Sequence, residues 1–333
     1  MSRRRRILML HTGGTLAMEG KRPSPLVPAD FERTLREHVP EISRIAQIRF
    51  EIFSNIDSSD MRPELWSALA RRIHDRLEEV DGVVVTHGTD TMAWTSSALS
   101  FMLRGLRKPV VITGSQRPLG EVRTDARLNL IDAVTAAASG PAEVCICFDS
   151  HLYRGNRARK IKINDYDAFE SPNFPPLGTL GVDIVYAEGR KPQGRPRLMN
   201  KLASPVFLLK IFPGICPATA RAILPGVKGL VVQGFGAGNF PIEGDASLLP
   251  LFDEARERNV PTLMLSQSRY NSVDLSLYEA GAAALERGVV SGGDMTPESA
   301  VVKLMHVLAY EKDLKVIREQ LKADLVGERT RWD

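Results

Sequence analysis

The chain has 333 residues, 43% of them hydrophobic and 25% charged, and 44 basic against 40 acidic side chains give a net charge of +4. This composition excludes intrinsic disorder, collagen and long coiled coils, and the length favours two domains with separate cores. No apolar run is long enough to span a bilayer and no export signal is recognisable, so no membrane partner is expected.

The basic residues do not form an obvious nucleic-acid surface. Arg3–Arg6 is a terminal run, the other cations are interleaved with acids, and aromatic residues make up only 6% of the chain. We therefore expect no nucleic-acid partner. Three cysteines are too few for a disulfide framework, which favours a cytoplasmic protein, and we expect all three to be buried as small apolar side chains.

Short runs rich in valine and isoleucine alternate with amphipathic stretches in the first half of the chain. The runs, expected to be buried parallel strands, are residues 7–10, 48–53, 82–86, 109–113 and 143–148. The helices between them are expected to start at or near Asp30, Pro63, Thr91 and Thr124. This order predicts an α/β fold in which a larger N-terminal domain, residues 1–186, holds a doubly wound, mainly parallel sheet.

The chain changes character at residues 187–205, which are dense in proline, glycine and cations and lack apolar periodicity. We predict an exposed linker there, followed by a smaller C-terminal α/β domain, residues 206–333. Its strands are expected at 206–212, 227–236 and 260–266, and its helices near 246–258, 276–287, 297–310 and 313–324.

Four segments that follow the first four predicted strands are unusually alike. They are HTGGTLAM (11–18), NIDSSDM (55–61), THGTDTM (86–92) and TGSQRP (113–118). Each supplies glycines, small hydroxyls or carboxylates instead of the bulky apolar residues that packing uses. Because the carboxyl ends of parallel strands meet at one edge of a sheet, these segments predict a polar, anion-friendly pocket.

Cofactor and metal chemistry fit these loops poorly. TGGT does not match the dinucleotide motif G-x-G-x-x-G, and the phosphate-binding motif G-x-x-x-x-G-K-[ST] is absent. The six histidines show no metal-ligand spacing. We therefore expect no cofactor and no metal.

Hydroxyl nucleophile chemistry remains, and it requires a base. The candidate hydroxyls are Thr12, Thr15, Ser58, Ser59, Thr86, Thr89, Thr91, Thr113 and Ser115. No histidine stands in a recognisable arrangement with a serine, whereas a lysine with a lowered pKa could serve. Lys160 and Lys162 follow the fifth predicted strand, in a charged stretch that is by default a solvated loop.

Taken together, HTGGTLAM, THGTDTM, TGSQRPLGEVRTDARLNL, YRGNRARK with DAFESPN, and GAGN resemble the bacterial-type L-asparaginases. The similarity is strongest to the cytosolic, type I branch and extends through SGGDMTPESAVVKL at 291–304. Each motif alone is weakly specific. The paired TGGT and HGTDT motifs, in the right order on successive strand ends, are highly specific.

The resemblance implies an amidohydrolase that converts L-asparagine and water to L-aspartate and ammonia through an acyl-enzyme intermediate. It assigns Thr15 as the nucleophile and Thr89, Asp90 and Lys160 as the proton-handling group, with Lys162 as the less suitable match for the lysine. Backbone N–H groups of the HGTD turn would stabilise the oxyanion. Asp57 and Asp90 carry the negative charge that would bind the ammonium group of the free amino acid.

Ser58 and Ser59 suit the substrate carboxylate. A purely structural role is the alternative for each of these loop residues: Asp57 or Ser59 would cap the following helix. For Thr12, as a turn residue, and for Asp125, as a charge at a helix N-terminus, we prefer the structural role.

One departure from the family pattern concerns a tyrosine. Family members commonly carry one shortly after TGGT, but residues 17–28 contain none. Some cytosolic members place a tyrosine of the second domain in the site, which makes Tyr278 a candidate catalytic residue and Tyr270 a weaker one; the alternative for Tyr278 is simple packing. We expect residues 17–28 to act as a lid.

Two further hypotheses stand beside the amidohydrolase. One is a subunit that supplies ammonia for tRNA amidation, although such subunits typically have an additional N-terminal domain and TGGT here begins at residue 12. The other is a non-catalytic asparagine-binding protein, which the missing loop tyrosine motivates. The resemblance also implies self-association as a dimer or tetramer.

Overall fold

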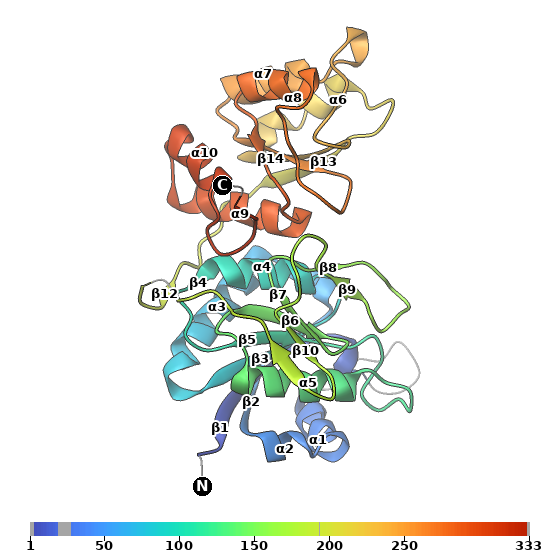
Figure 1. Cartoon of the computed structure of the whole chain (residues 1–333), viewed down its shortest axis with the longest axis vertical. Helices are drawn as coiled ribbons and strands as arrows, with labels where there is room; N and C mark the ends of the chain where they lie inside the picture. Colours follow the sequence, from blue (N-terminus) through green and yellow to red (C-terminus); the bar gives the residue numbers. More distant parts are fainter. Residues whose placement is uncertain (1–2, 19–27, 193, 332–333) are drawn as a thin grey trace. The chain divides into compact units, whose positions relative to one another are not determined.

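The computed structural model describes residues 3–18, 28–192 and 194–331 (Figure 1). It divides into two compact units, Met1–Asn200 and Lys201–Asp333, which are described separately. The division falls inside the stretch predicted as a linker. That stretch also contains a short strand, β12 (Arg197–Leu198), which pairs antiparallel with β4 (Leu103–Arg104) of the first unit. Two-residue strands carry no periodic signal, so the sequence did not indicate this one.

The first unit is built on an eight-stranded sheet with the order β11-β10-β7-β6-β5-β3-β1-β2. Its strands are β1 (Arg5–Gly13), β2 (Ala46–Ile56), β3 (Gly82–Thr86), β5 (Val110–Thr113), β6 (Val144–Phe148), β7 (His151–Arg154), β10 (Gly178–Leu180) and β11 (Ile184–Tyr186). The neighbouring strands β2, β1, β3, β5 and β6 pair in parallel. The remaining strands, β7, β10 and β11, pair antiparallel. The predicted mainly parallel sheet is confirmed.

The strand predicted at 48–53 is present as part of β2, but the prediction that it is buried is wrong. β2 has a single neighbour, β1, and its side chains alternate between exposed and partly buried positions. An edge strand has no partner on its outer side, so its apolar residues are covered only on the face that packs against helices. β3, β5 and β6, in the middle of the sheet, are buried throughout.

Helices cover both faces of this sheet (Figure 1). They are α1 (Pro28–His38), α2 (Ile42–Ile45), α3 (Pro63–Arg76), α4 (Met92–Met102) and α5 (Ala126–Ser139). α1, α2 and α5 share one hydrophobic core with alternate residues of the central strands, and α3 and α4 pack together on the other face. α3 begins at Pro63 and α4 follows Thr91, as predicted, whereas α1 begins at Pro28, before Asp30.

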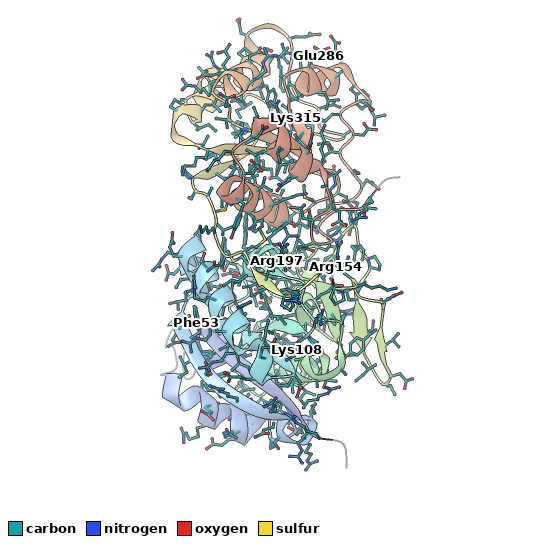
Figure 2. All side chains as sticks on the ribbon, turned by 90° about the vertical axis from the view of Figure 1, so that its left-hand side faces the viewer. Phe53, Lys108, Arg154, Arg197, Glu286 and Lys315 are labelled. Carbon is teal, nitrogen blue, oxygen red and sulfur yellow. The ribbon has the colours of Figure 1, made fainter. Side chains whose placement is uncertain are left out.

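A small hairpin, β8 (Arg159–Lys160) and β9 (Phe169–Glu170), follows the large sheet and was not predicted. The segment before it is anchored by a buried ion pair, in which Arg154 Nε lies 2.7 Å from Glu143 Oε2. The Arg154 guanidinium, labelled in Figure 2, also lies 4.2 Å from the centre of the Phe174 ring. These contacts fix the chain just before Lys160.

The second unit contains a four-stranded parallel sheet with the order β13-β14-β15-β16. Its elements are β13 (Val206–Lys210), α6 (Pro217–Arg221), β14 (Gly229–Gly234), α7 (Leu249–Glu257), β15 (Thr262–Ser266), α8 (Glu279–Glu286), β16 (Val290–Ser291), α9 (Pro297–Tyr310) and α10 (Leu314–Lys322). The smaller C-terminal α/β unit is therefore confirmed. The sequence missed α6 and β16, which are too short to carry a periodic signal.

The expected burial of all three cysteines is wrong for one of them. Cys145 and Cys147 on β6 are buried, but Cys216 is exposed just before α6. Hydrogen bonds from Thr219 and the backbone of Ala218 lower the pKa of the Cys216 thiol. Its chain neighbour Ile215 is buried, so exposure at this point differs between adjacent residues.

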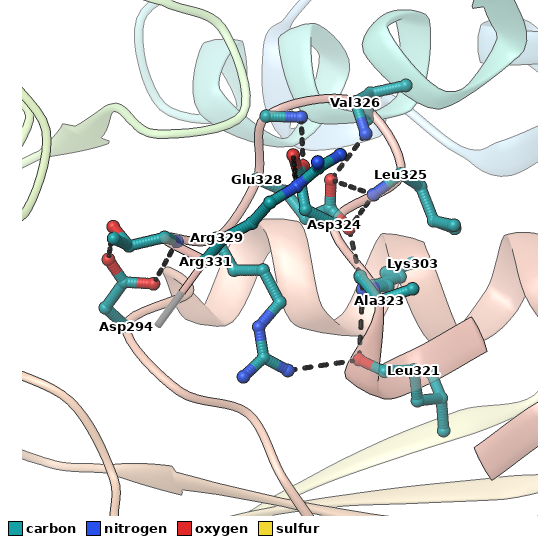
Figure 3. A network of polar contacts seen from close by, with 12 residues as sticks. Asp294, Lys303, Leu321, Ala323, Asp324, Leu325, Val326, Glu328, Arg329 and Arg331 are labelled. Carbon is teal, nitrogen blue, oxygen red and sulfur yellow. Dashed lines mark hydrogen bonds and ion pairs between the residues drawn. The ribbon is translucent and has the colours of Figure 1, made fainter. Parts of the chain in front are cut away.

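A buried polar network holds the end of the second unit (Figure 3). Lys303 Nζ on α9 lies 2.6 Å from Glu328 Oε1, and both side chains are 0% exposed. Lys303 also donates to the carbonyl of Leu321, while Glu328 accepts from the backbone N–H groups of Leu325 and Val326. The network therefore fastens the segment after α10 to α9.

Among the described residues, no helix has the length and apolar character needed to cross a membrane.

Candidate active site

The predicted loops meet at one edge of the large sheet because their strands are neighbours. His11 at the end of β1 pairs with Thr86 of β3, and Thr86 pairs with Thr113 of β5. β2 lies on the other side of β1, where Gly13 pairs with Ile56. The four loops that follow these strands therefore begin side by side.

Glycines allow three of these loops to touch. A Cβ atom on Gly14 would lie 2.5 Å from Gly88 Cα, and one on Gly88 would lie 2.7 Å from Ser58 Oγ. Gly14 also has φ +93°, a conformation that other residues rarely adopt. The TGGT turn thus lies against the HGTD turn, and the HGTD turn lies against Ser58.

Thr15 follows Gly14 directly and starts a short 3₁₀ turn, Thr15–Ala17, where it is half-buried. The turn is closed by a hydrogen bond of 3.0 Å from Met18 N to the Thr15 carbonyl. Thr15 is therefore held at the point where the TGGT and HGTD turns meet.

Thr89, Asp90 and Lys160 form one cluster. Lys160 Nζ, from β8, donates to Thr89 Oγ1 at 2.7 Å and lies 2.7 Å from Asp90 Oδ1. Thr89 is buried, the Lys160 side chain is 15% exposed and the Asp90 side chain is 67% exposed. The cluster can therefore exchange protons with bound molecules or with water while Thr89 stays fixed.

The structure places Lys162 elsewhere. Its ammonium pairs with the carboxylates of Asp167 and Asp165 on the exposed loop after β8. These pairs raise the pKa of Lys162, chiefly through the hydrogen bond to Asp167. Of the two lysines that sequence reasoning left open, only Lys160 contacts Thr89 among the described contacts.

The loop after β2 carries the three residues assigned to the substrate's charged ends. Asp57 caps the short turn Ser58–Asp60, because its carboxylate accepts from Ser59 N at 2.8 Å and from Ser59 Oγ at 2.7 Å. These hydrogen bonds lower the pKa of Asp57. Asp57 and Ser59 are exposed, and Ser58 is buried against the HGTD turn, where its carbonyl accepts from Thr91 Oγ1 at 2.6 Å.

Thr12 and Asp125, for which structural roles were preferred, hold backbone in place. Thr12 Oγ1 donates to the Thr86 carbonyl at 2.9 Å and so ties the end of β1 to β3. Asp125 lies at the N-terminus of α5, where a helix-end charge was expected, and its side chain makes no cap hydrogen bond there. Its carboxylate accepts from Gln116 N, Arg117 N and Asn129 Nδ2 at 2.9–3.1 Å, which fixes the TGSQRP loop.

Sequence reasoning missed His87 and Gln116. His87 is buried, with Nδ1 2.7 Å from the Gly88 carbonyl and Nε2 2.9 Å from Thr95 Oγ1. Burial lowers the pKa of His87 to about 4, so the ring is neutral at pH 7 and supports the HGTD turn as a structural group. Gln116 lies within 3.4 Å of Thr89 Oγ1. Its only signal in the sequence was its place in the TGSQRP loop.

The candidate tyrosines lie in the second unit. Tyr278 stands just before α8 and is 58% exposed, so it does not pack into a core, and Tyr270 is exposed as well. Most of the expected lid, residues 19–27, lies outside the described residues. No group of three or more His, Cys, Asp or Glu side chains that could hold a metal occurs in the described part of the chain.

Fold and site together define a two-unit α/β protein with a threonine–lysine–aspartate cluster at the carboxyl edge of a mainly parallel sheet. Comparison with known proteins gives the family. Residues 6–191 match the family model "Asparaginase, N-terminal" and residues 205–321 match "Glutaminase/Asparaginase C-terminal domain". The chain therefore belongs to the asparaginase family.

Individual relatives agree with this assignment. L-asparaginase 1 of Escherichia coli K12 is 38% identical over 97% of this chain and 98% of that protein. The structure of the thermostable L-asparaginase from Thermococcus kodakarensis superposes with a TM-score of 0.90 and 35% identity, covering 98% of this chain and 100% of the other. A glutamyl-tRNA(Gln) amidotransferase subunit of the same organism is 37% identical, over 97% of this chain and 76% of that protein.

Proposed function

We propose that this protein hydrolyses L-asparagine to L-aspartate and ammonia, with Thr15 as the nucleophile. The observation that carries the proposal is the Lys160–Thr89–Asp90 cluster, held next to the TGGT turn in a chain of the asparaginase family. A threonine hydroxyl needs a nearby base to become a nucleophile, and this cluster supplies groups that accept and pass on protons.

In the first step Thr15 Oγ attacks the side-chain amide carbon and its proton passes to the cluster. The carbonyl oxygen becomes an oxyanion, which the backbone N–H groups of the HGTD turn stabilise. The C–N bond then breaks, and the leaving amine takes a proton from the cluster and departs as ammonia. The product of this step is an aspartyl ester on Thr15.

In the second step a water molecule attacks the ester carbon. Thr89 passes one proton of the water to Lys160, the C–O bond to Thr15 breaks, and that proton returns to Thr15 Oγ as aspartate is released. Tyr278 is the tyrosine we assign to assist the nucleophile in place of the absent loop tyrosine.

Binding of the free amino acid requires opposite charges in one small pocket. Asp57 and Asp90 bind the α-ammonium, and Ser58 and Ser59 bind the α-carboxylate through hydroxyl and backbone N–H groups. The low pKa of Asp57 keeps it anionic at neutral pH, which supports its role toward an ammonium. Holding both ends fixes the amide carbon near Thr15.

The test is ammonia release from L-asparagine and L-glutamine, with Thr15→Ala and Thr89→Val as variants. We expect both variants to lose at least about 10³-fold in kcat while remaining folded, as losing a nucleophile or its activating group does. A fully active Thr15→Ala protein would refute the assignment. If the wild type released no ammonia but asparagine raised its Tm, the protein would be an asparagine binder instead.

One observation favours a second candidate, an ammonia-supplying subunit for tRNA amidation: the 37% identity to a glutamyl-tRNA(Gln) amidotransferase subunit. Full turnover of free asparagine without any tRNA would contradict it. We also propose a cytoplasmic location, supported by three free cysteines, and self-association as a dimer or tetramer, which sedimentation of the purified chain tests.

A further inference from the structure

We infer that Gln116 is a positioning residue for the reaction, because its side-chain carbonyl accepts the hydroxyl proton of Thr89 and so sets the direction of that hydroxyl. The inference rests on the proposed function, in which Thr89 passes protons. It assigns a role to the TGSQRP loop that neither the motifs nor the family match provides.

The first observation is the orientation of the Gln116 amide. Nε2 donates to the carbonyl of Asp165 at 3.0 Å and lies 3.5 Å from the carbonyl of Lys162. Both of those groups are acceptors only, so the NH₂ end of the amide must face them. Oε1 is thereby directed to Thr89 Oγ1, 3.4 Å away.

The second observation is that the Gln116 backbone is fixed as firmly as its side chain. Gln116 N donates to the Asp125 carboxylate at 2.9 Å, and that carboxylate is itself held by Asn129 Nδ2 at 3.1 Å. Asn129 Nδ2 also donates to the carbonyl of Gly114 at 3.0 Å. Gln116 therefore joins two loops, residues 113–118 and 161–167, directly beside Thr89.

The third observation concerns the proton on Thr89. Lys160 Nζ donates to Thr89 Oγ1 at 2.7 Å, so while the amine is charged the hydroxyl proton has to point to a different acceptor. Gln116 Oε1 is that acceptor. When Lys160 becomes neutral its lone pair can accept the same proton, and the hydroxyl turns from Gln116 toward the amine.

Gln116 thus holds Thr89 in one arrangement while Lys160 is charged and competes with Lys160 once it is neutral. Because the anchors come from two loops, the position of Thr89 depends on both loops at once. A side chain of similar shape without polar atoms, such as methionine, would fill the space and leave the hydroxyl undirected. A glutamate would keep an acceptor but place a negative charge two hydrogen bonds from Lys160.

The experiment measures kcat and KM for asparagine hydrolysis between pH 5 and 10, with Tm, for the wild type, Gln116→Met and Gln116→Glu. Gln47→Met is the matched control, because Gln47 is exposed on the edge strand β2. We expect Gln116→Met to lower kcat about 10-fold with KM changed less than about twofold, the loss of one directed hydrogen bond in the reacting group.

Gln116→Glu distinguishes a role in proton transfer from a purely structural role, because a structural role would leave the pH profile unchanged. A nearby negative charge favours the more protonated state of the reacting cluster, so the acid limb of the kcat/KM profile should move to higher pH by about one unit. Gln47→Met should match the wild type in every measurement. A Gln116→Met enzyme with kcat within twofold of the wild type, or an unshifted profile for Gln116→Glu, would overturn the inference.

The outcome also separates this inference from the proposed function. A wild type that releases no ammonia, or a Thr89→Val variant with full activity, would overturn both. An active wild type and an inactive Thr89→Val variant beside an indifferent Gln116→Met would overturn the role of Gln116 alone.

Discussion

The molecule contains two lysine–carboxylate pairs with nearly equal separations and opposite surroundings. Lys160 lies 2.7 Å from Asp90, and these side chains are 15% and 67% exposed, whereas Lys303 lies 2.6 Å from Glu328 with both fully buried. The first pair shares its lysine with a threonine hydroxyl, and the second shares its lysine with backbone carbonyls. The distance between two charges is thus uninformative about their role; what else they contact, and whether water reaches them, decides it.

The energetics of the two pairs differ accordingly. Lys160–Asp90 should contribute little to stability, because its exposed aspartate is screened by water and is solvated even without the lysine. A fully buried pair costs a great deal when only one partner is removed, because a charge is left without compensation in a medium that solvates it poorly. Desolvation lowers the pKa of Lys303, and the Glu328 charge opposes that shift.

The largest expected effect comes from breaking the Lys160–Asp90 pair, which water reaches. We expect Lys160→Met to lower kcat at least about 10³-fold because Thr89 loses its proton partner, while the free energy of unfolding changes by less than about 1 kcal/mol. Steady-state kinetics and urea unfolding measure the two quantities. Lys162→Met is the matched control, two residues away on the exposed loop, and should stay within about threefold of the wild type. Comparable losses in both variants would contradict the separation of the two lysines.

Breaking the buried Lys303–Glu328 pair, here called the sealed pair, should lower stability and leave catalysis unchanged. We expect Lys303→Met to lower the free energy of unfolding by about 3–5 kcal/mol, because Glu328 is left buried and unpaired, with kcat per folded molecule unchanged. The double variant Lys303→Met, Glu328→Leu should recover part of that loss. Lys315→Met, on the exposed face of the neighbouring helix α10, should lie within about 0.5 kcal/mol of the wild type. Equal stability of the Lys303 and Lys315 variants would refute the sealed-pair interpretation.

His87 is a buried titratable group that stays neutral, unlike the two charged pairs, and it supports the HGTD turn that Lys160 contacts. Its pKa is about 4 in the folded protein against 6.5 for an unperturbed ring. Between those values the unfolded chain binds more protons, so stability is lost as the pH falls from about 6.5 to 4. A shift of this size corresponds to about 3 kcal/mol.

Urea unfolding at a series of pH values measures this loss. We expect His87→Gln to be less stable than the wild type at pH 7, since Gly88 and Thr95 lose well-placed partners, and to lose less stability on acidification. His38 is a suitable comparison because it lies at the exposed end of α1; His38→Gln should retain the wild-type dependence. An unchanged acid dependence in His87→Gln would show that the titration of other groups dominates.

How far the sequence predicted these features depends on the range of the interactions. The four site loops could be placed because valine-rich strands in βα order force their carboxyl ends to one edge. The choice between Lys160 and Lys162 could not be made from the residues alone, because it depends on the two-residue hairpin β8–β9. The family resemblance supplied that choice.

Other features depend on contacts between residues far apart in the chain, with no local pattern. Local rules placed Asp125 at a helix N-terminus, where it lies, but they did not indicate that its carboxylate also holds Gln116, nine residues away. Gln116 and Lys303 lie in quoted segments, TGSQRP and SGGDMTPESAVVKL, but nothing in those segments indicates that their partners are Thr89 and Glu328. The exposed Cys216 shows the converse limit, because a residue type that is usually buried lies here on the surface just before α6.

The smallest expected effect concerns Asp132 on α5, a buried carboxylate whose Oδ2 atom has no hydrogen-bond partner among the described residues. Desolvation raises its pKa to about 6, partly offset by a hydrogen bond with Ser150. The folded state therefore holds a proton that the unfolded chain releases near pH 4, and stability is lost as the pH rises through about 6. Asp132→Asn should be more stable than the wild type at pH 8 by about 1 kcal/mol, because the amide brings no charge into this buried site.

The same variant should match the wild type near pH 4, where both side chains are neutral. Asp75→Asn, an exposed substitution on α3, is the control and should show no such difference. If Asp132→Asn were instead less stable than the wild type at pH 8, the carboxylate would have a compensating partner there, as Lys160 and Lys303 provide for theirs. Asp132 therefore tests the rule drawn from the two lysine pairs, that a charge in this protein is tolerated only where a partner or water reaches it.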